Sequence, residues 1–122
     1  MGHNAYAHLF FGIPLSFEME WEELIGDVDE KKFLSELFGT KDHGVEFILL
    51  GSGDYPVWAI SAKGYEVQAD WGETVPVLNR MFPGLDVHQR IVTLYQFLKT
   101  KHPDEDFKFT DQPQHYLGAS LL

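Results

Sequence analysis

Apolar runs separated by turn residues predict several β-strands along the chain. Runs rich in aromatic and β-branched side chains are Tyr6–Leu15, Val45–Leu50, Val57–Ala62 and Tyr65–Trp71. Gly51–Asp54 has the composition of a tight turn, so the second and third runs are expected to form a hairpin. Lys63 and Gly64 predict another turn, which makes the fourth run the third strand of a meander. The last two apolar runs, Phe107–Thr110 and Gln114–Leu121, predict edge strands.

Two segments have the apolar spacing of amphipathic helices. In the first, Asp27 and Glu30 form a capping-box pattern, and Gly39 suits the position after the last turn. Its apolar face is Phe33, Leu34, Leu37 and Phe38. In the second, Asp86 is the predicted cap, and Pro103 ends the helix. Its apolar face is Val87, Ile91, Leu94, Tyr95 and Leu98.

Two other segments are less regular in pattern. Residues 17–22 alternate apolar and acidic residues, as in a half-buried strand. Phe17, Trp21, Leu24 and Ile25 also have helical spacing, with Ser16 as a candidate N-cap and Gly26 as a stop. Because glutamate favours helices over strands, a short helix is the preferred interpretation. Residues 73–81 contain a proline and predict a short helix or an irregular loop.

The order of these elements predicts a single α+β domain over residues 1–122. Strands with central hairpins and two helical segments indicate a two-layer sandwich, with a mainly antiparallel sheet and helices on one face. A split βαβ, ferredoxin-like arrangement is the specific expectation. Since this fold serves many unrelated functions, it indicates little about activity.

Composition and charge narrow the classes of partner. The 122 residues are 44% hydrophobic and 15% aromatic, which is too apolar for a disordered chain. The net charge of −10 disfavours direct nucleic-acid binding and anionic membranes, so basic or neutral partners are expected. The absence of cysteine is compatible with a reducing compartment, and the N-terminal residues have no basic region of a signal peptide. We therefore expect a cytoplasmic protein.

Most of the excess negative charge lies between Ser16 and Glu46. This stretch contains ten acidic residues against three lysines, which accounts for −7 of the net −10. Acidic residues beside aromatic ones suit the capture of a basic protein surface, because charge steers the encounter and apolar area stabilises the complex. The alternatives are a solvated helix face and mimicry of nucleic-acid phosphates. The candidate partner surface is Phe17, Glu18, Glu20, Trp21, Glu22, Glu23, Asp29 and Glu30. Trp21 or Phe17 is expected to be the exposed aromatic anchor of this surface.

Aromatic residues on the middle strands suggest a second candidate site, a ligand pocket. Its residues are Asp54, Tyr55, Trp58, Tyr65, Asp70 and Trp71. Core packing is the preferred interpretation of these rings, with Trp58 and Tyr65 as cross-strand neighbours beneath the helices. The alternative is an aromatic platform on the open face of the sheet, which could stack on a ligand or peptide.

No motif of nucleophilic, metal or phosphate chemistry accompanies these residues. Gly51-Ser52-Gly53 lacks the lysine of a phosphate-binding loop and precedes a strand. The six histidines are not paired at metal-binding spacing; His43 and Glu46 merely flank a strand start. Asp104–Asp106 predicts a solvated loop. No metal, cofactor or catalytic residue is therefore predicted, and an enzyme is disfavoured without being ruled out.

The sequence thus predicts a small acidic, non-enzymatic protein-binding module. Its composition suits an inhibitor or adaptor of the phage or mobile-element type that binds a basic surface of a host protein. The alternative is a small-molecule-binding domain or small enzyme that uses the aromatic pocket. A homo-oligomer, paired through edges such as residues 117–122, is a further expectation.

Overall fold

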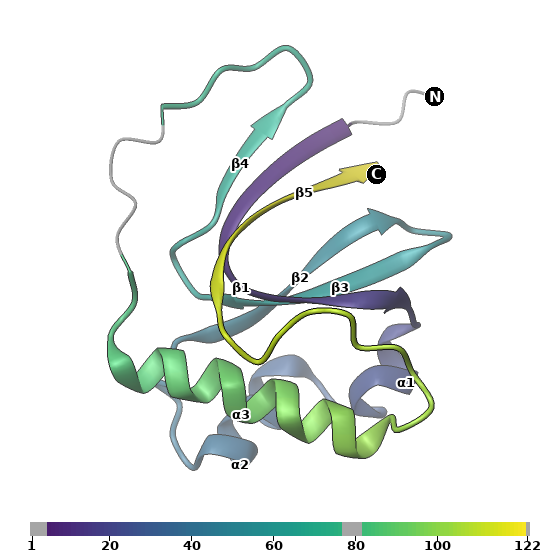
Figure 1. Cartoon of the computed structure of the whole chain (residues 1–122), viewed down its shortest axis with the longest axis vertical. Helices are drawn as coiled ribbons and strands as arrows, with labels where there is room; N and C mark the ends of the chain where they lie inside the picture. The colour runs from purple at the N-terminus through teal and green to yellow at the C-terminus, as the bar shows by residue number, and fades with distance from the viewer. Residues whose placement is uncertain (1–4, 77–81, 122) are drawn as a thin grey trace.

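One five-stranded mixed sheet and three helices make up residues 5–76 and 82–121, the part of the chain that the computed structural model describes (Figure 1). In chain order the elements are β1 (Ala5–Glu18), α1 (Trp21–Ile25), α2 (Glu30–Phe38), β2 (Val45–Ser52), β3 (Pro56–Ala62), β4 (Val67–Asp70), α3 (Leu85–Lys101) and β5 (Gln114–Leu121). The helices lie together on one side of the sheet, so the predicted two-layer α+β class is confirmed.

The long strand β1 organises the sheet because its two halves pair with different strands. Its first half lies between β5 and β4, and its second half pairs with β3; all three pairings are antiparallel. Gly12 is the crossing point, opposite Gln114 of β5 and Ser61 of β3. The end of β2 also meets β5 in parallel, at Gly51 and Ser120. The strands therefore close a circuit, β1–β3–β2–β5, with β4 added outside it.

Within this circuit the predicted split βαβ unit is present. Strands β1 and β2 both run antiparallel to β3, which lies between them, and α1 and α2 connect the two. The meander prediction was wrong, because β4 pairs with β1 instead of β3. Both edges of β3 are already occupied, by β2 and by the second half of β1. Nor is β5 an edge strand, since it lies between β1 and β2. Residues 107–110, predicted as a strand, have no regular structure.

Alternate side chains of the sheet supply two cores. The larger core lies between the sheet and the helices, where Ile91, Leu94, Tyr95 and Leu98 of α3 are fully buried. The smaller core lies on the opposite face and consists of Phe10, Ile48, Leu50 and Ala59, with Val57 and Tyr116 packed beside them. Since Phe10 and Phe11 are neighbours in β1, consecutive residues serve the two cores, as the alternation of a strand requires.

The helix starts differ from those predicted. Asp29, not Asp27, caps α2, with its carboxylate accepting from the Lys31 N–H at 3.0 Å. Gly84, not Asp86, is the N-cap residue of α3. Gly39 ends α2 in the left-handed conformation, as predicted. Residues 73–76 have no regular structure, and the rest of the segment predicted with them lies outside the described residues.

Both patterns of residues 17–25 are used, one after the other. Strand β1 continues to Glu18, which pairs with Val57, and helix α1 starts only at Trp21. Ser16 is therefore within a strand and caps no helix; its hydroxyl instead donates to the Asp106 carbonyl at 2.7 Å. Gly26 ends α1 as predicted. No helix in the described part of the chain has the length and apolar character to cross a membrane.

Candidate functional site

Acidic residues from three separate parts of the chain converge at one end of the molecule. This region, here called the acidic end, lies on the right of Figure 1, where β1 ends, α1 begins, β2 turns into β3 and α3 leads towards β5. Its acids are Glu18, Glu20, Glu22, Glu23, Asp54, Asp104, Glu105 and Asp106. Sequence analysis placed the first four on a candidate surface but treated Asp104–Asp106 as an unrelated loop.

Short contacts hold the three segments together. The Ser16 hydroxyl accepts from the Lys108 N–H at 2.8 Å, which fixes the loop before β5 against β1. The rings of Phe17 and Phe107 pack edge to face, with centroids 4.9 Å apart. On the other side, the Met19 N–H donates to the Pro56 carbonyl at 3.0 Å. The convergence of the acids is thus a consequence of tertiary structure that no local pattern could show.

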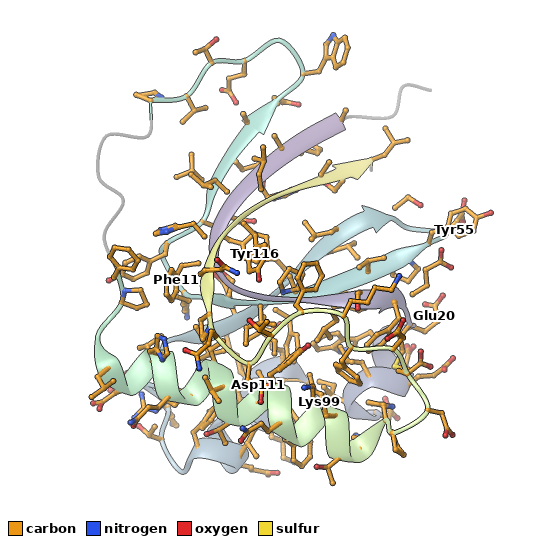
Figure 2. The ribbon with its side chains drawn as sticks, in the orientation of Figure 1. Phe11, Glu20, Tyr55, Lys99, Asp111 and Tyr116 are labelled. Carbon is orange, nitrogen blue, oxygen red and sulfur yellow. The ribbon has the colours of Figure 1, made fainter. Side chains whose placement is uncertain are left out.

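The carboxylates of the acidic end are available to a partner. Seven of the eight residues are exposed, and Glu105 is half-buried. In residues 5–76 and 82–121 the carboxylates within salt-bridge distance of a basic group are Glu66, beside His8, and Asp111, beside Lys99, so none of the eight acids has such a neighbour. Tyr55 is 62% exposed beside them, and Figure 2 shows it on the same side as Glu20. The acidic end therefore combines unpaired charge with one exposed aromatic ring.

The aromatic residues predicted as anchors have a different environment. Phe17 and Trp21 are half-buried and pack against the larger core. Trp21 lies 4.8 Å from Trp58 and 5.2 Å from Phe47 between ring centroids. These rings hold α1 against the sheet. Asp29 and Glu30, which were predicted on the same surface, lie instead at the start of α2.

The residues predicted for a ligand pocket are spread over the sheet. Trp58 is half-buried, and its indole N–H donates to the Met19 carbonyl at 2.9 Å. Its neighbour across the hairpin is Leu49, so the predicted Trp58–Tyr65 cross-strand pair was wrong. Trp58 and Tyr65 do both pack against the larger core, as the core interpretation predicted. Trp71 is 86% exposed at the end of β4. Asp54 and Tyr55 are at the β2–β3 turn, and Asp70 is at the end of β4.

A cavity of about 800 Å³ lies elsewhere, between α2 and the start of β2. Its charged lining consists of Asp29, Glu30, Lys31, Lys32, Glu36, Lys41, Glu46 and Lys63. His43 also lines it, and its Nδ1 accepts from the Val45 N–H at 3.2 Å. Although lysines and carboxylates are equal in number, none of them forms an ion pair with another in the described ranges.

Burial perturbs three groups in this cavity. Desolvation raises the pKa of Glu30, and the nearby charge of Glu46 raises it further. The backbone N–H of Phe47 acts in the opposite direction and lowers this pKa. Desolvation also raises the pKa of Glu46, with a further contribution from Glu66. The pKa of His43 is lowered, first by burial and then by Lys63. Clustered perturbed groups in a cavity are typical of functional sites. Here the cavity holds two carboxyl groups with raised pKa values and one imidazole with a lowered pKa.

A buried hydrogen-bonded chain links Ser120, His8 and Glu66. The His8 ring lies 2.8 Å from the Ser120 hydroxyl through Nε2 and 2.8 Å from the Glu66 carboxylate through Nδ1. The same atom pattern occurs in Ser-His-acid catalytic triads. However, Ser120 is 4% exposed and its backbone lies between β1 and β2. The chain therefore fastens β5 and the residue before β4 to β1.

Sequence reasoning missed both the cavity and this chain. His43 and Glu46 were noted only as flanking a turn, and His8 with Ser120 are 112 positions apart. Among the described residues, no group of three or more histidine and acidic residues is arranged to hold a metal ion. Comparisons with protein-family models, with curated proteins and with solved structures each found no match to the chain.

Proposed function

We propose that this protein is a non-enzymatic binding module that captures a basic protein surface through its acidic end. The observation that supports this proposal is the convergence of eight acids, unpaired within the described residues, from three chain segments. Clustered charge of one sign raises the rate of encounter with an oppositely charged partner. An inhibitor or adaptor that acts on a basic host protein, of the kind encoded by phages and mobile elements, is the class we favour.

The exposed aromatic ring gives the surface an apolar contact. Tyr55 is 62% exposed and its neighbour Asp54 is also exposed, so a partner that meets the carboxylates can cover the ring. Tyrosine is favoured in interfaces because a large ring is buried at a low entropic cost. Tyr55 takes over the anchoring role that sequence analysis gave to Phe17 and Trp21.

The proposal is tested by neutralising charge at the acidic end against a matched neutralisation elsewhere. The test variant carries Glu18→Gln, Glu20→Gln, Glu22→Gln and Glu23→Gln. The control carries Glu36→Gln, Asp42→Asn, Glu73→Gln and Asp86→Asn, all exposed positions of other segments. Both variants change the net charge from −10 to −6, so a difference between them reports position and not total charge. Asp29 is left intact because its carboxylate caps α2.

The binding partner in this test is a lysine- and arginine-rich peptide, and affinity is measured by titration calorimetry over a range of salt concentrations. We expect the test variant to lose about fivefold to tenfold in affinity at low salt, and the control about twofold. The salt dependence should flatten in the test variant because fewer charges are screened. Equal losses in the two variants would contradict the proposal, and far-UV circular dichroism verifies that both remain folded.

A second candidate function is the binding of a small polar molecule in the cavity between α2 and β2. The specific observation that favours it is the grouping of Glu30, His43 and Glu46, all with shifted pKa values, in one cavity. Lysines suit an anionic group and the two carboxylates suit a donor or cation, so free amino acids are suitable probes. Amide shifts confined to residues 43–47 on adding such probes would support it; unchanged spectra would exclude these probes.

A further inference from the structure

The face of the sheet that carries the helices extends beyond them. In Figure 1 the first half of β1 rises with β4 and β5 away from the helical layer. Phe11 still packs in the core beneath the helices. Residues 9, 7 and 5 of β1 follow on the same face because side chains alternate along a strand. None of the three helices in the described residues lies over this part of the face, here called the apolar sheet face.

The strand register shows which residues share the apolar sheet face. Its rows across β4, β1 and β5 are Val67–Leu9–Leu117 and Ala69–Ala7–Ala119, followed by Ala5–Leu121. All eight residues are apolar, and none carries a charge. Leu117 is 76% exposed and Leu121 is 48% exposed, while Ala7 and Ala119 are also exposed. The strand positions that face solvent are normally polar. Because the exposed positions here are apolar, we infer that a partner covers this face.

The lower boundary of the face is also apolar. Phe82, which is 70% exposed, packs edge to face on Phe11 with ring centroids 5.6 Å apart, and lies 5.2 Å from the ring of His115. At typical side-chain areas, the exposed fractions of this face and Phe82 amount to roughly 600 Å², at the upper end for a monomer. Two such faces together approach the roughly 1,200 Å² at which stable interfaces begin.

We propose that the apolar sheet face is the contact between two copies of this chain, packed face to face around a two-fold axis. In the register the row of alanines lies between the rows that carry Leu117 and Leu121, and alanine side chains are shorter than leucine side chains. Under two-fold symmetry the leucines of one copy can pack against the alanine row of the other, so the face is complementary to itself. Sheets stacked in this way lie about 10 Å apart.

The lack of charge on the apolar sheet face favours a second copy of the chain as its partner over the basic protein proposed for the acidic end. The face offers no carboxylate to a basic surface, whereas an identical uncharged face loses no ionic hydration on contact. Repulsion between the two chains is weak there, because the acidic end lies away from β4 (Figure 1) and charges are screened over about 8 Å at physiological salt. The earlier expectation of edge pairing through residues 117–122 is replaced by face packing, since β5 is paired with β1 along its described length.

Sedimentation equilibrium of the full chain tests this proposal. We expect a mass that rises from 14.0 kDa towards twice that value as the concentration increases from about 1 µM to about 1 mM. Leu117→Asp should raise the dissociation constant at least tenfold, because it puts a charge in the middle of the contact. Tyr55→Asp is the matched control, since it places the same charge at another exposed apolar position and should leave the dissociation constant unchanged.

Salt and a milder variant complete the test. High salt should leave the dimer intact or strengthen it, while weakening the binding of the basic peptide, so the two contacts are separable. Leu117→Thr keeps a strand-forming residue and should weaken the dimer with an unchanged circular dichroism spectrum. A monomer at every concentration, or a dimer that withstands Leu117→Asp, would overturn the proposal. So would weaker peptide binding by monomeric Leu117→Asp, since a basic partner would then occupy the face.

Discussion

Replacing Gly12 with alanine tests the close approach of β1 to β3. At this residue β1 changes from pairing with β5 to pairing with β3. A Cβ at this position would overlap the carbonyl oxygen of Ile60 and lie 2.8 Å from its carbonyl carbon and 2.9 Å from the Ser61 Cα. Ordinary contacts begin at 3.4 Å, so backbone of β3 must retreat by at least about 0.5 Å, and more at the oxygen. Backbone, unlike a flexible side chain, cannot make that movement without breaking the hydrogen-bonded ladder.

The loss in free energy of unfolding can be worked out from the contacts between β1 and β3 that Gly12→Ala would break. Two or three ladder hydrogen bonds at about 1 kcal/mol each, together with the loosened packing of Ile13 and Ile60, give about 3–5 kcal/mol. This is a large fraction of the roughly 5–15 kcal/mol by which a domain is stable. Urea unfolding followed by tryptophan fluorescence should therefore show a much lower midpoint, or no cooperative transition.

Gly53→Ala is the control for this measurement. Gly53 is in the β2–β3 turn, its φ is not positive, and a Cβ there would meet nothing within 4 Å. Alanine at this position should leave the free energy of unfolding within about 1 kcal/mol of the wild type. A Gly12→Ala protein as stable as this control, with a native circular dichroism spectrum, would refute the inferred crossing.

Two further substitutions test buried groups through the pH dependence of the free energy of unfolding. Tyr95→Phe removes the 2.6 Å bond to the Phe109 carbonyl and should cost about 1–2 kcal/mol at pH 7. Because burial raises the pKa of Tyr95 to about 12, the wild type should also lose stability from pH 10 towards 12, and the variant should not show this contribution. Glu46→Gln should stabilise the protein at pH 7 and match the wild type below pH 4, since a raised carboxyl pKa lowers stability as pH increases above 4.5. Identical pH profiles for wild type and variant would contradict the assigned burial in either case.

Local pattern was sufficient for most elements but not for their pairing. The apolar runs predicted β2, β3 and β5 nearly to the residue, since each has strong alternation or a continuous apolar core. The same runs contain no information about partners: β4 follows β3 in sequence yet pairs with β1, because β3 has no free edge. The predicted N-cap residues of α2 and α3 were also wrong. Asp27 and Asp29 are both suitable caps by residue type, and α2 begins after the second.

The candidate site was predictable only where its charges are adjacent in sequence. Glu18–Glu23 was visible as an acidic stretch, whereas Asp104–Asp106 joins it through the contacts of Ser16 with residues 106 and 108. Likewise, the cavity brings Glu30 of α2 beside Glu46 of β2, two residues on separate elements. Such contacts depend on distances in space that no spacing in the chain reveals.

The most direct test of the proposed function is to map where a basic peptide binds. Amide resonances of the ¹⁵N-labelled protein would be followed during titration with the lysine- and arginine-rich peptide at low salt. We predict that the largest shifts fall together on residues 18–23, 54–55 and 104–106, and that salt reverses them. Shifts distributed over all exposed acids, or confined to the cavity between α2 and β2, would contradict an acidic end that acts as one binding surface.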